Sequence, residues 1–221
     1  ECDKIYTIFI FTPEQVTDKN RFKSDIAIAF MIGALGELGK EIRQKGGQLF
    51  MLFGENDSVV EKCIDAWNID TVYWNRDYTP YAKKRDSSVE KLCKKKGIAV
   101  SISEDYYLNP PGTILTGGGT AYLKYTPYMN KAMSKGFPSP SSARVQFLSR
   151  STKKIKGADI SLKEAFSDFV DTEQEMTETF KREKAIEILR KASKFSNYDK
   201  TRNDLEGQTT RLSAPIKFGV V

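Results

Sequence analysis

Short apolar runs alternate with segments of helical periodicity along the first hundred residues. The apolar runs are rich in β-branched and aromatic residues and predict buried strands. They are residues 5–11, 48–53, 70–74 and 98–102. Between them, apolar residues at helical spacing predict helices over 24–45, from a cap at Asp57, and over 86–96. Strands separated by such helices form a parallel sheet covered on both faces, so we predict a doubly wound α/β domain at residues 1–130. Its ligand crevice is expected at the carboxyl ends of the strands.

The periodicity disappears after residue 130. Residues 131–171 are rich in proline, serine and basic residues, and we interpret them as an irregular interdomain linker. Helical spacing resumes from about Thr172, with Leu189 among the residues of its predicted buried face, and leads toward Tyr198. Residues 172–221 are therefore predicted to begin a second, helical domain that the chain does not finish.

Composition excludes several classes of function. The 221 residues contain no histidine, which rules out Ser–His or Cys–His catalysis and a histidine-ligated zinc site in this chain. No apolar run reaches membrane-spanning length, so we expect no membrane partner. Cys2, Cys63 and Cys93 lack metal-site spacing. Cys63 and Cys93 lie in apolar helical patterns, which indicates buried free thiols in a reducing intracellular compartment.

The net charge of +6 is concentrated in one part of the chain. Residues 101–156 hold 8 basic and 2 acidic residues, which accounts for the whole excess. Such a stretch is compatible with contact to nucleic-acid phosphates, and equally with a solvated linker. Within it, Gly117-Gly118-Gly119 follows Thr116 but lacks the spacing of a nucleotide-binding loop, so we predict a tight turn there.

Residues 74–86 form the densest group of charged and aromatic side chains in the first domain. Asn75, Arg76 and Asp77 follow directly after the predicted third strand, at the crevice end of the sheet. This chemistry fits an anion or aromatic-ligand site. It fits better a salt-bridged entry to a helix, because Pro80 suits a first helical turn.

The last segment gathers hydroxyl side chains before an apolar run. Thr209, Thr210 and Ser213 lie within five residues and precede Ile216, Phe218 and Val220. A phosphate-binding loop offers hydroxyl and backbone N–H groups in this way at the start of a helix. An ordinary N-cap followed by a buried helix gives the same spacing.

Four blocks of sequence together resemble the DNA photolyase and cryptochrome family. Residues 198–219, Tyr-x-x-x-Arg-Asn followed by Thr-Thr-Arg-Leu-Ser-Ala-x-x-Lys-Phe-Gly, resemble its first flavin-binding segment. Residues 75–86, Asn-x-Asp-Tyr-Thr-Pro-Tyr-x-x-x-Arg-Asp, are similar to the strand-three segment of class I photolyases. Residues 109–112, Thr116-Gly117 and residues 122–128 look like the family's leucine/proline loop and its Tyr-x-x-Phe-Thr-Pro-Phe motif. The blocks follow the family's order over nearly the whole chain.

The resemblance implies a Rossmann-like antenna domain followed by the start of an all-α domain that binds FAD. The implied activity is that of a deoxyribodipyrimidine photolyase, a carbon–carbon lyase in which light-excited reduced FAD repairs ultraviolet-induced pyrimidine dimers in DNA. The family also includes cryptochromes, which are flavoprotein photoreceptors without repair activity. A third interpretation is a stand-alone α/β module with a vestigial flavin segment.

Carried over to this chain, the resemblance assigns functional residues only to the last segment. The implied FAD contacts are Tyr198, Thr209, Thr210, Arg211, Leu212 and Ser213. Arg202 matches an arginine that approaches a DNA phosphate. The resemblance assigns no catalytic residue and no metal ligand to this chain.

The chain departs from the family pattern in ways that affect the cofactors. Gly118-Gly119-Thr120 stands where folate-binding members have Asn-x-Glu, so a deazaflavin or an empty antenna site is expected at least as much as a folate. Residues 11–16 replace most of a Phe-Arg-x-Asp-Leu-Arg block. The parts that enclose the flavin ring would follow Val221, so we expect weak FAD binding by this chain alone. We expect either a fragment or a split-gene product that a second polypeptide completes.

Overall fold

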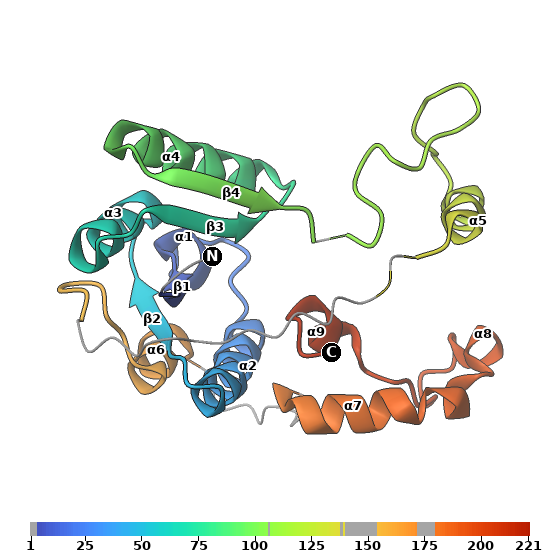
Figure 1. Cartoon of the computed structure of the whole chain (residues 1–221). Helices are drawn as coiled ribbons and strands as arrows, with labels where there is room; N and C mark the ends of the chain where they lie inside the picture. Colours follow the sequence, from blue (N-terminus) through green and yellow to red (C-terminus); the bar gives the residue numbers. More distant parts are fainter. Residues whose placement is uncertain (1–3, 106, 138, 140–153, 172–179) are drawn as a thin grey trace. The chain divides into compact units, whose positions relative to one another are not determined.

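The computed structural model describes residues 4–105, 107–137, 139, 154–171 and 180–221 (Figure 1). The elements in chain order are β1 (Thr7–Phe11), α1 (Pro13–Val16), α2 (Asp25–Gln44), β2 (Leu49–Phe53), α3 (Asn56–Trp67), β3 (Thr71–Asn75), α4 (Pro80–Lys96), β4 (Ala99–Ser103), α5 (Tyr125–Lys135), α6 (Leu162–Phe169), α7 (Arg182–Arg190), η2 (Ala192–Phe195), α8 (Tyr198–Thr201) and α9 (Ser213–Lys217). No helix in these ranges is both long and apolar enough to cross a membrane.

The chain divides into two compact units. The first unit comprises Glu1–Glu55 and Gln146–Val221, and the second comprises Asn56–Val145. The first unit therefore joins the amino-terminal βαβ segment to the carboxyl-terminal helices. The domain boundaries predicted from periodicity, at residues 130 and 171, remain predictions.

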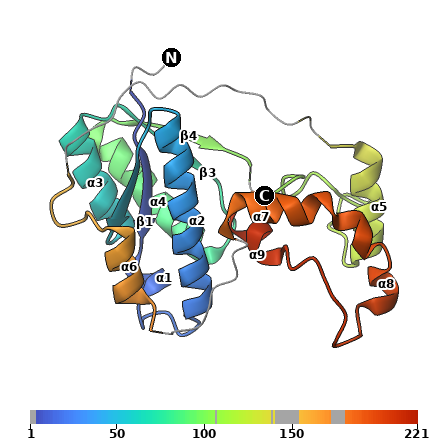
Figure 2. The ribbon, with the colours of Figure 1, turned by 90° about the horizontal axis from the view of Figure 1, so that it is seen from below.

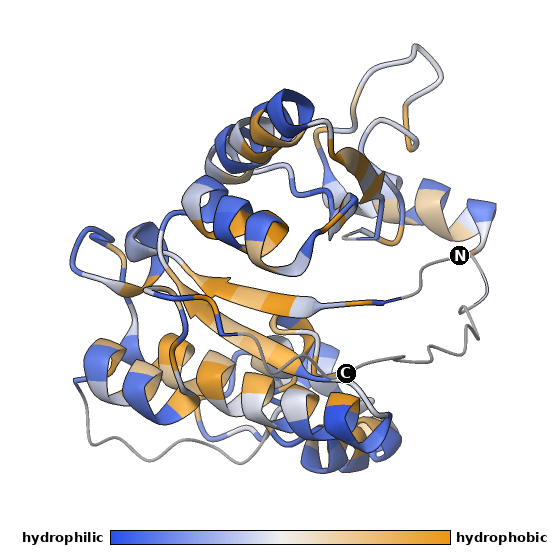
Figure 3. Cartoon of the chain, turned by 60° about the vertical axis from the view of Figure 1, so that its left-hand side comes forward, coloured by the Kyte–Doolittle hydropathy of each residue, from blue (hydrophilic) through white to orange (hydrophobic). Residues whose placement is uncertain are grey.

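The first unit is built on a parallel βαβ segment. β1 pairs with β2 in register from Thr7 opposite Leu49 to Phe11 opposite Phe53, and α2 connects the two strands. The colouring in Figure 3 marks these strands as hydrophobic, as expected for strands that a helix covers. The other edge of β2 pairs with residues 158–160, through Phe53 N–H to the Ala158 carbonyl (2.7 Å) and Ile160 N–H to the Met51 carbonyl (3.1 Å).

Helix α2 is the central element of the first unit. It begins after Ser24, whose Oγ accepts a hydrogen bond from the Ala27 N–H (3.4 Å), and Asp25 adds a favourable charge at its amino end. α2 contributes residues to two buried apolar clusters, and Figure 2 shows β1 and α6 beside it. One cluster joins it to β1 and α6: Phe11, Val16, Ile28, Ala29, Ile32, Leu35, Ala165, Phe169 and Val170. The other joins it to α7 and the last segment: Phe30, Ala185, Leu212 and Val220.

Helix α6 corrects the expectation of irregular structure over residues 131–171. It is held by a capping box in which Ser161 Oγ accepts from the Glu164 N–H and the Glu164 carboxylate accepts from the Ser161 N–H. Ala165 and Phe169 are buried against α2. The Ser-x-x-Glu signal was visible in the sequence, but a two-turn helix is too short to show clear periodicity.

The second unit contains the other parallel pair. β3 pairs with β4 from Thr71 opposite Ala99 to Asn75 opposite Ser103. Cys63 on α3 and Cys93 on α4 are buried cysteines outside any disulfide, as predicted. The reducing compartment stays a prediction, and Cys2 lies outside the described residues. Helix α4 begins at Pro80, as the proline indicated, and six residues before the start that apolar spacing gave. The Thr79 hydroxyl caps it there (3.2 Å to the Ala82 N–H).

The glycine triplet forms a tight turn, as predicted. Leu115 and Ala121 form an antiparallel bridge, and the Gly119 N–H donates to the Thr116 carbonyl (3.0 Å). Gly119 has a φ of 76°, a conformation that favours glycine. The turn offers no carboxylate and opens no helix.

Candidate functional site

The predicted flavin residues lie in the last segment of the first unit. Tyr198 begins the single-turn helix α8 and is 53% exposed. Arg202 directly follows this helix and is also exposed. Residues 202–212 then form a loop without regular structure, which leads into α9. The six predicted residues thus lie within residues 198–213, in which only Leu212 is buried.

The three hydroxyl side chains of this stretch have no partner in the described part of the chain. Thr209 and Ser213 are exposed and Thr210 is half-buried. The N-cap of α9 is Leu212, and no side chain makes a capping hydrogen bond there. This contradicts the interpretation of the hydroxyls as an ordinary helix cap. The hydroxyls remain available to an external group.

Arg211 adds a positive charge in an unusual backbone conformation. Its φ is 51°, in the left-handed region, which costs a non-glycine residue about 1–3 kcal/mol. Its side chain is exposed and forms no ion pair with any described residue. A strained residue persists only where its neighbours hold it, so the buried contacts of Leu212 fix the backbone beside the hydroxyls.

The segment is anchored to α2 and α7 on both sides of α9. Leu212 is 5% exposed and Val220 is 7% exposed, and both belong to the same buried cluster as Phe30. The Phe218 ring lies 5.3 Å from the Phe30 ring. Arg182 Nη1 donates a hydrogen bond of 2.6 Å to the Val220 carbonyl. Sequence reasoning identified the hydroxyl residues but missed Arg182 and Phe30, because both contacts join distant parts of the chain.

Several apolar side chains near this segment are exposed, contrary to expectation. Leu189 on α7 is 50% exposed and Ile216 on α9 is 63% exposed, although their apolar spacing predicted burial. Leu205 in the loop is fully exposed. Helical spacing identifies an apolar face but does not say what covers it.

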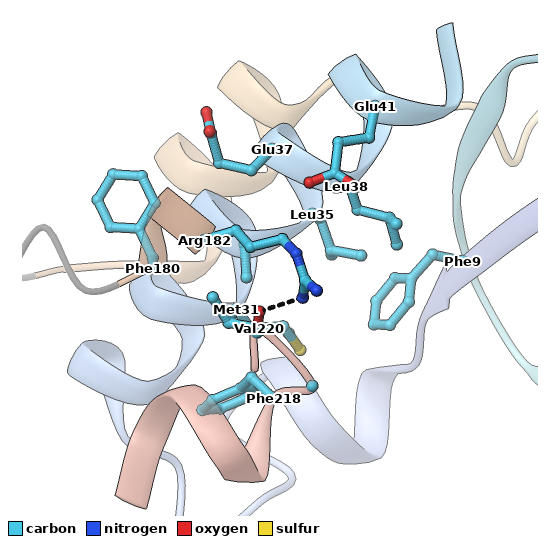
Figure 4. A pocket seen from close by; sticks show the side chains of 12 residues that line it. Phe9, Met31, Leu35, Glu37, Leu38, Glu41, Phe180, Arg182, Phe218 and Val220 are labelled. Carbon is cyan, nitrogen blue, oxygen red and sulfur yellow. Dashed lines mark hydrogen bonds between the residues drawn. The ribbon is translucent and has the colours of Figure 1, made fainter. Parts of the chain in front are cut away.

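A pocket of about 180 Å³ lies beside the same anchoring contacts (Figure 4). Its walls come from β1, α2, the start of α7 and residues 218–220, and they are mainly apolar. Leu38, one of the apolar residues at helical spacing on α2, is 46% exposed and lines this pocket. Glu37, Glu41 and Arg182 are its charged lining residues.

In the second unit, the segment after β3 combines an ion pair with an aromatic pair. Arg76 Nε lies 2.7 Å from Glu104 Oε1, and the Tyr78 hydroxyl donates to Glu104 Oε2. This hydrogen bond raises the pKa of Tyr78. The Tyr78 and Tyr107 rings lie 5.6 Å apart. The ion pair and the Pro80 helix start confirm the predicted salt-bridged helix entry. The sequence reasoning missed Glu104 and Tyr107, which follow β4 at the same end of the sheet.

A buried donor lies next to this cluster in the chain. Trp74 is on β3, and its Nε1 is buried without a hydrogen-bond partner among the described residues. A buried indole N–H usually finds an acceptor, so the acceptor for this one lies outside the described residues.

The sequence matches the family model "DNA photolyase" over residues 1–158. The chain is 28% identical to a deoxyribodipyrimidine photo-lyase from Synechococcus over 203 residues, which cover 88% of this chain and 42% of that protein. It is 29% identical to cryptochrome-1 from Anopheles gambiae over 143 residues, which cover 62% of this chain and 25% of that protein. The chain thus spans less than half the length of these relatives.

A solved structure matches the whole chain. The archaeal photolyase from Sulfolobus tokodaii, whose structure contains two FAD molecules, superposes with a TM-score of 0.80 at 27% identity. The match covers 100% of this chain and 47% of that one, so it includes the last segment, which lies outside the family-model match. The expected α/β fold is confirmed, and the chain belongs to the DNA photolyase family.

Proposed function

We propose that this chain is the amino-terminal part of a deoxyribodipyrimidine photolyase, which repairs pyrimidine dimers in DNA with light and FAD. The observation that carries this proposal is the match of the whole chain to the Sulfolobus photolyase, at a TM-score of 0.80 and 27% identity. The Synechococcus photo-lyase supports it over 88% of the chain. The remaining part of the fold comes either from sequence continuous with this chain or from a second polypeptide.

The last segment has the chemistry to hold the polar part of FAD. Thr209, Thr210 and Ser213 carry hydroxyls without partners in the described chain, and Arg211 adds an exposed guanidinium. Hydroxyl donors and a charged guanidinium are suited to a pyrophosphate. The Leu212 side chain is buried against α2, so only its backbone is left to face the cofactor. When bound, FAD supplies the light-driven electron that splits the dimer.

The exposed positions of Tyr198 and Arg202 fit supporting roles. Tyr198 offers a half-exposed ring to the cofactor. Arg202 is exposed and forms no ion pair with any described residue, so its guanidinium is available to a DNA phosphate. A contact of this kind is sequence-independent and weakens as the salt concentration rises.

We further propose a flavin-type or deazaflavin antenna chromophore in preference to a folate. The glycine turn at residues 117–119 carries no carboxylate that would recognise a folate. At the carboxyl end of β3 and β4, the aromatic pair of Tyr78 and Tyr107 provides stacking surface. The Trp74 N–H, which has no acceptor among the described residues, provides a donor. The Sulfolobus structure, with its two FAD molecules, implies a novel light-harvesting cofactor in that protein.

The test is to purify the protein that contains residues 1–221 together with the rest of the fold. Flavin absorbance and a light-dependent loss of dimers from ultraviolet-treated DNA are the expected results. Flavin without dimer loss favours the second candidate, a cryptochrome-type photoreceptor, which the likeness to the mosquito cryptochrome supports. Absence of flavin overturns both and favours a vestigial α/β module.

A further inference from the structure

One hydrogen bond joins the first residue of α7 to the end of the proposed flavin segment. Arg182 Nη1 donates to the Val220 carbonyl at 2.6 Å across 38 positions of sequence. The donor is a guanidinium, and charge-assisted hydrogen bonds are about twice as strong as neutral ones. Figure 4 shows the guanidinium inside the pocket, with this bond drawn as a dashed line.

Among the described residues, the hydrogen bond to Val220 is the polar contact that the structure gives for the Arg182 guanidinium. Glu37 and Glu41 line the same pocket, but neither forms an ion pair with Arg182 in the described part of the chain. Their negative charges still favour a cation there. Arg182 is exposed overall, so it is not a core residue whose replacement would remove buried apolar area.

Two backbone hydrogen bonds connect Val220, through α9, to Leu212, the residue before Ser213. The Val220 N–H donates to the Pro215 carbonyl (2.8 Å), and the Ile216 N–H donates to the Leu212 carbonyl (2.9 Å). Holding Val220 therefore holds α9, which begins with Ser213. The apolar contacts of Leu212 and Val220 are non-directional, whereas a hydrogen bond fixes orientation.

We propose that Arg182 is a positioning residue for the flavin-binding segment. It acts through the Val220 carbonyl and sets the orientation of α9, and through α9 that of Thr209, Thr210 and Ser213. The inference depends on the proposed function, in which these hydroxyls hold the polar part of FAD. It adds a residue, outside the loop itself, on which flavin affinity depends.

The first experiment uses the chain alone and needs no flavin. Hydrogen exchange of the backbone amides of residues 216–220 is measured in the wild type, in Arg182→Ala and in the control Arg190→Ala. Arg190 is an exposed arginine on the same helix and forms no ion pair with any described residue. Loss of a charged hydrogen bond should speed exchange of the Val220 amide about tenfold in Arg182→Ala and leave the control unchanged. Equal exchange in all three proteins overturns the inference.

The second experiment measures flavin in the protein that also contains the rest of the fold. Arg182→Ala should raise the FAD dissociation constant about tenfold, with the global melting temperature unchanged. Arg182→Lys, which keeps the charge but not the planar fork, should restore part of the affinity, and Arg190→Ala should match the wild type. If Arg182→Ala binds FAD as tightly as Arg190→Ala, the inference is wrong. If the wild type binds no FAD, the proposed function fails, while the exchange experiment still reports on the hydrogen bond.

Discussion

Replacing glycines on α2 by alanine provides a sharp test of its packing. A glycine inside a helix costs about 0.8–1 kcal/mol relative to alanine. At Gly33, an added Cβ would lie 2.8 Å from Phe180 Cδ2 and 2.9 Å from Phe180 Cγ. At Gly39, the nearest atom outside the helix is Leu49 Cβ at 4.0 Å, an ordinary contact. The two substitutions therefore make the same gain in helix propensity but meet opposite packing conditions.

The difference between the gain in helix propensity and the cost of overpacking decides whether each substitution stabilises or destabilises the chain. Gly39→Ala should raise the free energy of unfolding by about 0.5–1 kcal/mol, because nothing opposes the propensity gain. Gly33→Ala must displace the Phe180 ring, and overpacking of this kind costs about 1–3 kcal/mol. The overpacking cost is larger than the propensity gain, so we expect a net loss of about 1 kcal/mol. The displaced ring also packs edge-to-face against Phe30, with ring centres 6.4 Å apart.

Urea-induced unfolding, followed by circular dichroism, measures both variants against the wild type. A second pair of proteins, Phe180→Ala alone and Phe180→Ala with Gly33→Ala, isolates the contact between the added Cβ and the Phe180 ring. Without the ring, Gly33→Ala should become stabilising by about 1 kcal/mol, like Gly39→Ala. The reasoning is refuted if Gly33→Ala stabilises the wild type as much as Gly39→Ala does. It is also refuted if removing Phe180 leaves the effect of Gly33→Ala unchanged.

Three further predictions concern other parts of the chain. The Ser88 hydroxyl, which donates to Asp57 Oδ2 at 2.6 Å, holds the pKa of Asp57 below its ordinary value of 3.8. This stabilisation is present above pH 3.8 and is lost as the pH falls through the lowered pKa. The free energy of unfolding, measured from about pH 6 downward, should therefore fall less steeply in Ser88→Ala than in the wild type. In a Cys2→Ser background, the buried thiols of Cys63 and Cys93 should resist a thiol reagent until urea unfolds the chain; burial also raises the pKa of Cys93. Rapid native labelling of either would contradict this. Ser161→Ala should cost about 1 kcal/mol in urea unfolding, and no change would show that the capping box does not stabilise α6.

The sequence predicted the strands because their signal is local. The expected run of residues 98–102 and the observed β4 at Ala99–Ser103 differ by one position. The signal of α2 is also local, because its cap residue Ser24 and its apolar residues at helical spacing are both visible in the sequence. Apolar spacing alone misplaced the start of α4 by six residues, because the Thr79 cap decides that start and places it at Pro80. Short helices such as α6 failed because two turns show too little periodicity.

The residues of the candidate site could be predicted only where they lie close together in the sequence. The hydroxyls of Thr209 and Thr210 could be found this way, supported by the family resemblance. The bond from Arg182 to Val220 could not, because it joins positions 38 residues apart and neither residue type signals it. The exposure of Ile216 could not be predicted either, because apolar spacing identifies the apolar face of a helix but not the element that packs against it.

The pairing of residues 158–160 with the edge of β2 has a consequence for synthesis of the chain. β1 and β2 are complete once residue 53 has been made, but the edge of β2 stays open until roughly a hundred more residues follow. At about 5–20 residues per second, this takes on the order of 5–20 s. During that time the nascent chain carries an apolar strand with unpaired backbone groups, which invites association between neighbouring chains. Until residues 158–160 pair with it, the open edge of β2 is therefore the part of the first unit most exposed to pairing with another chain.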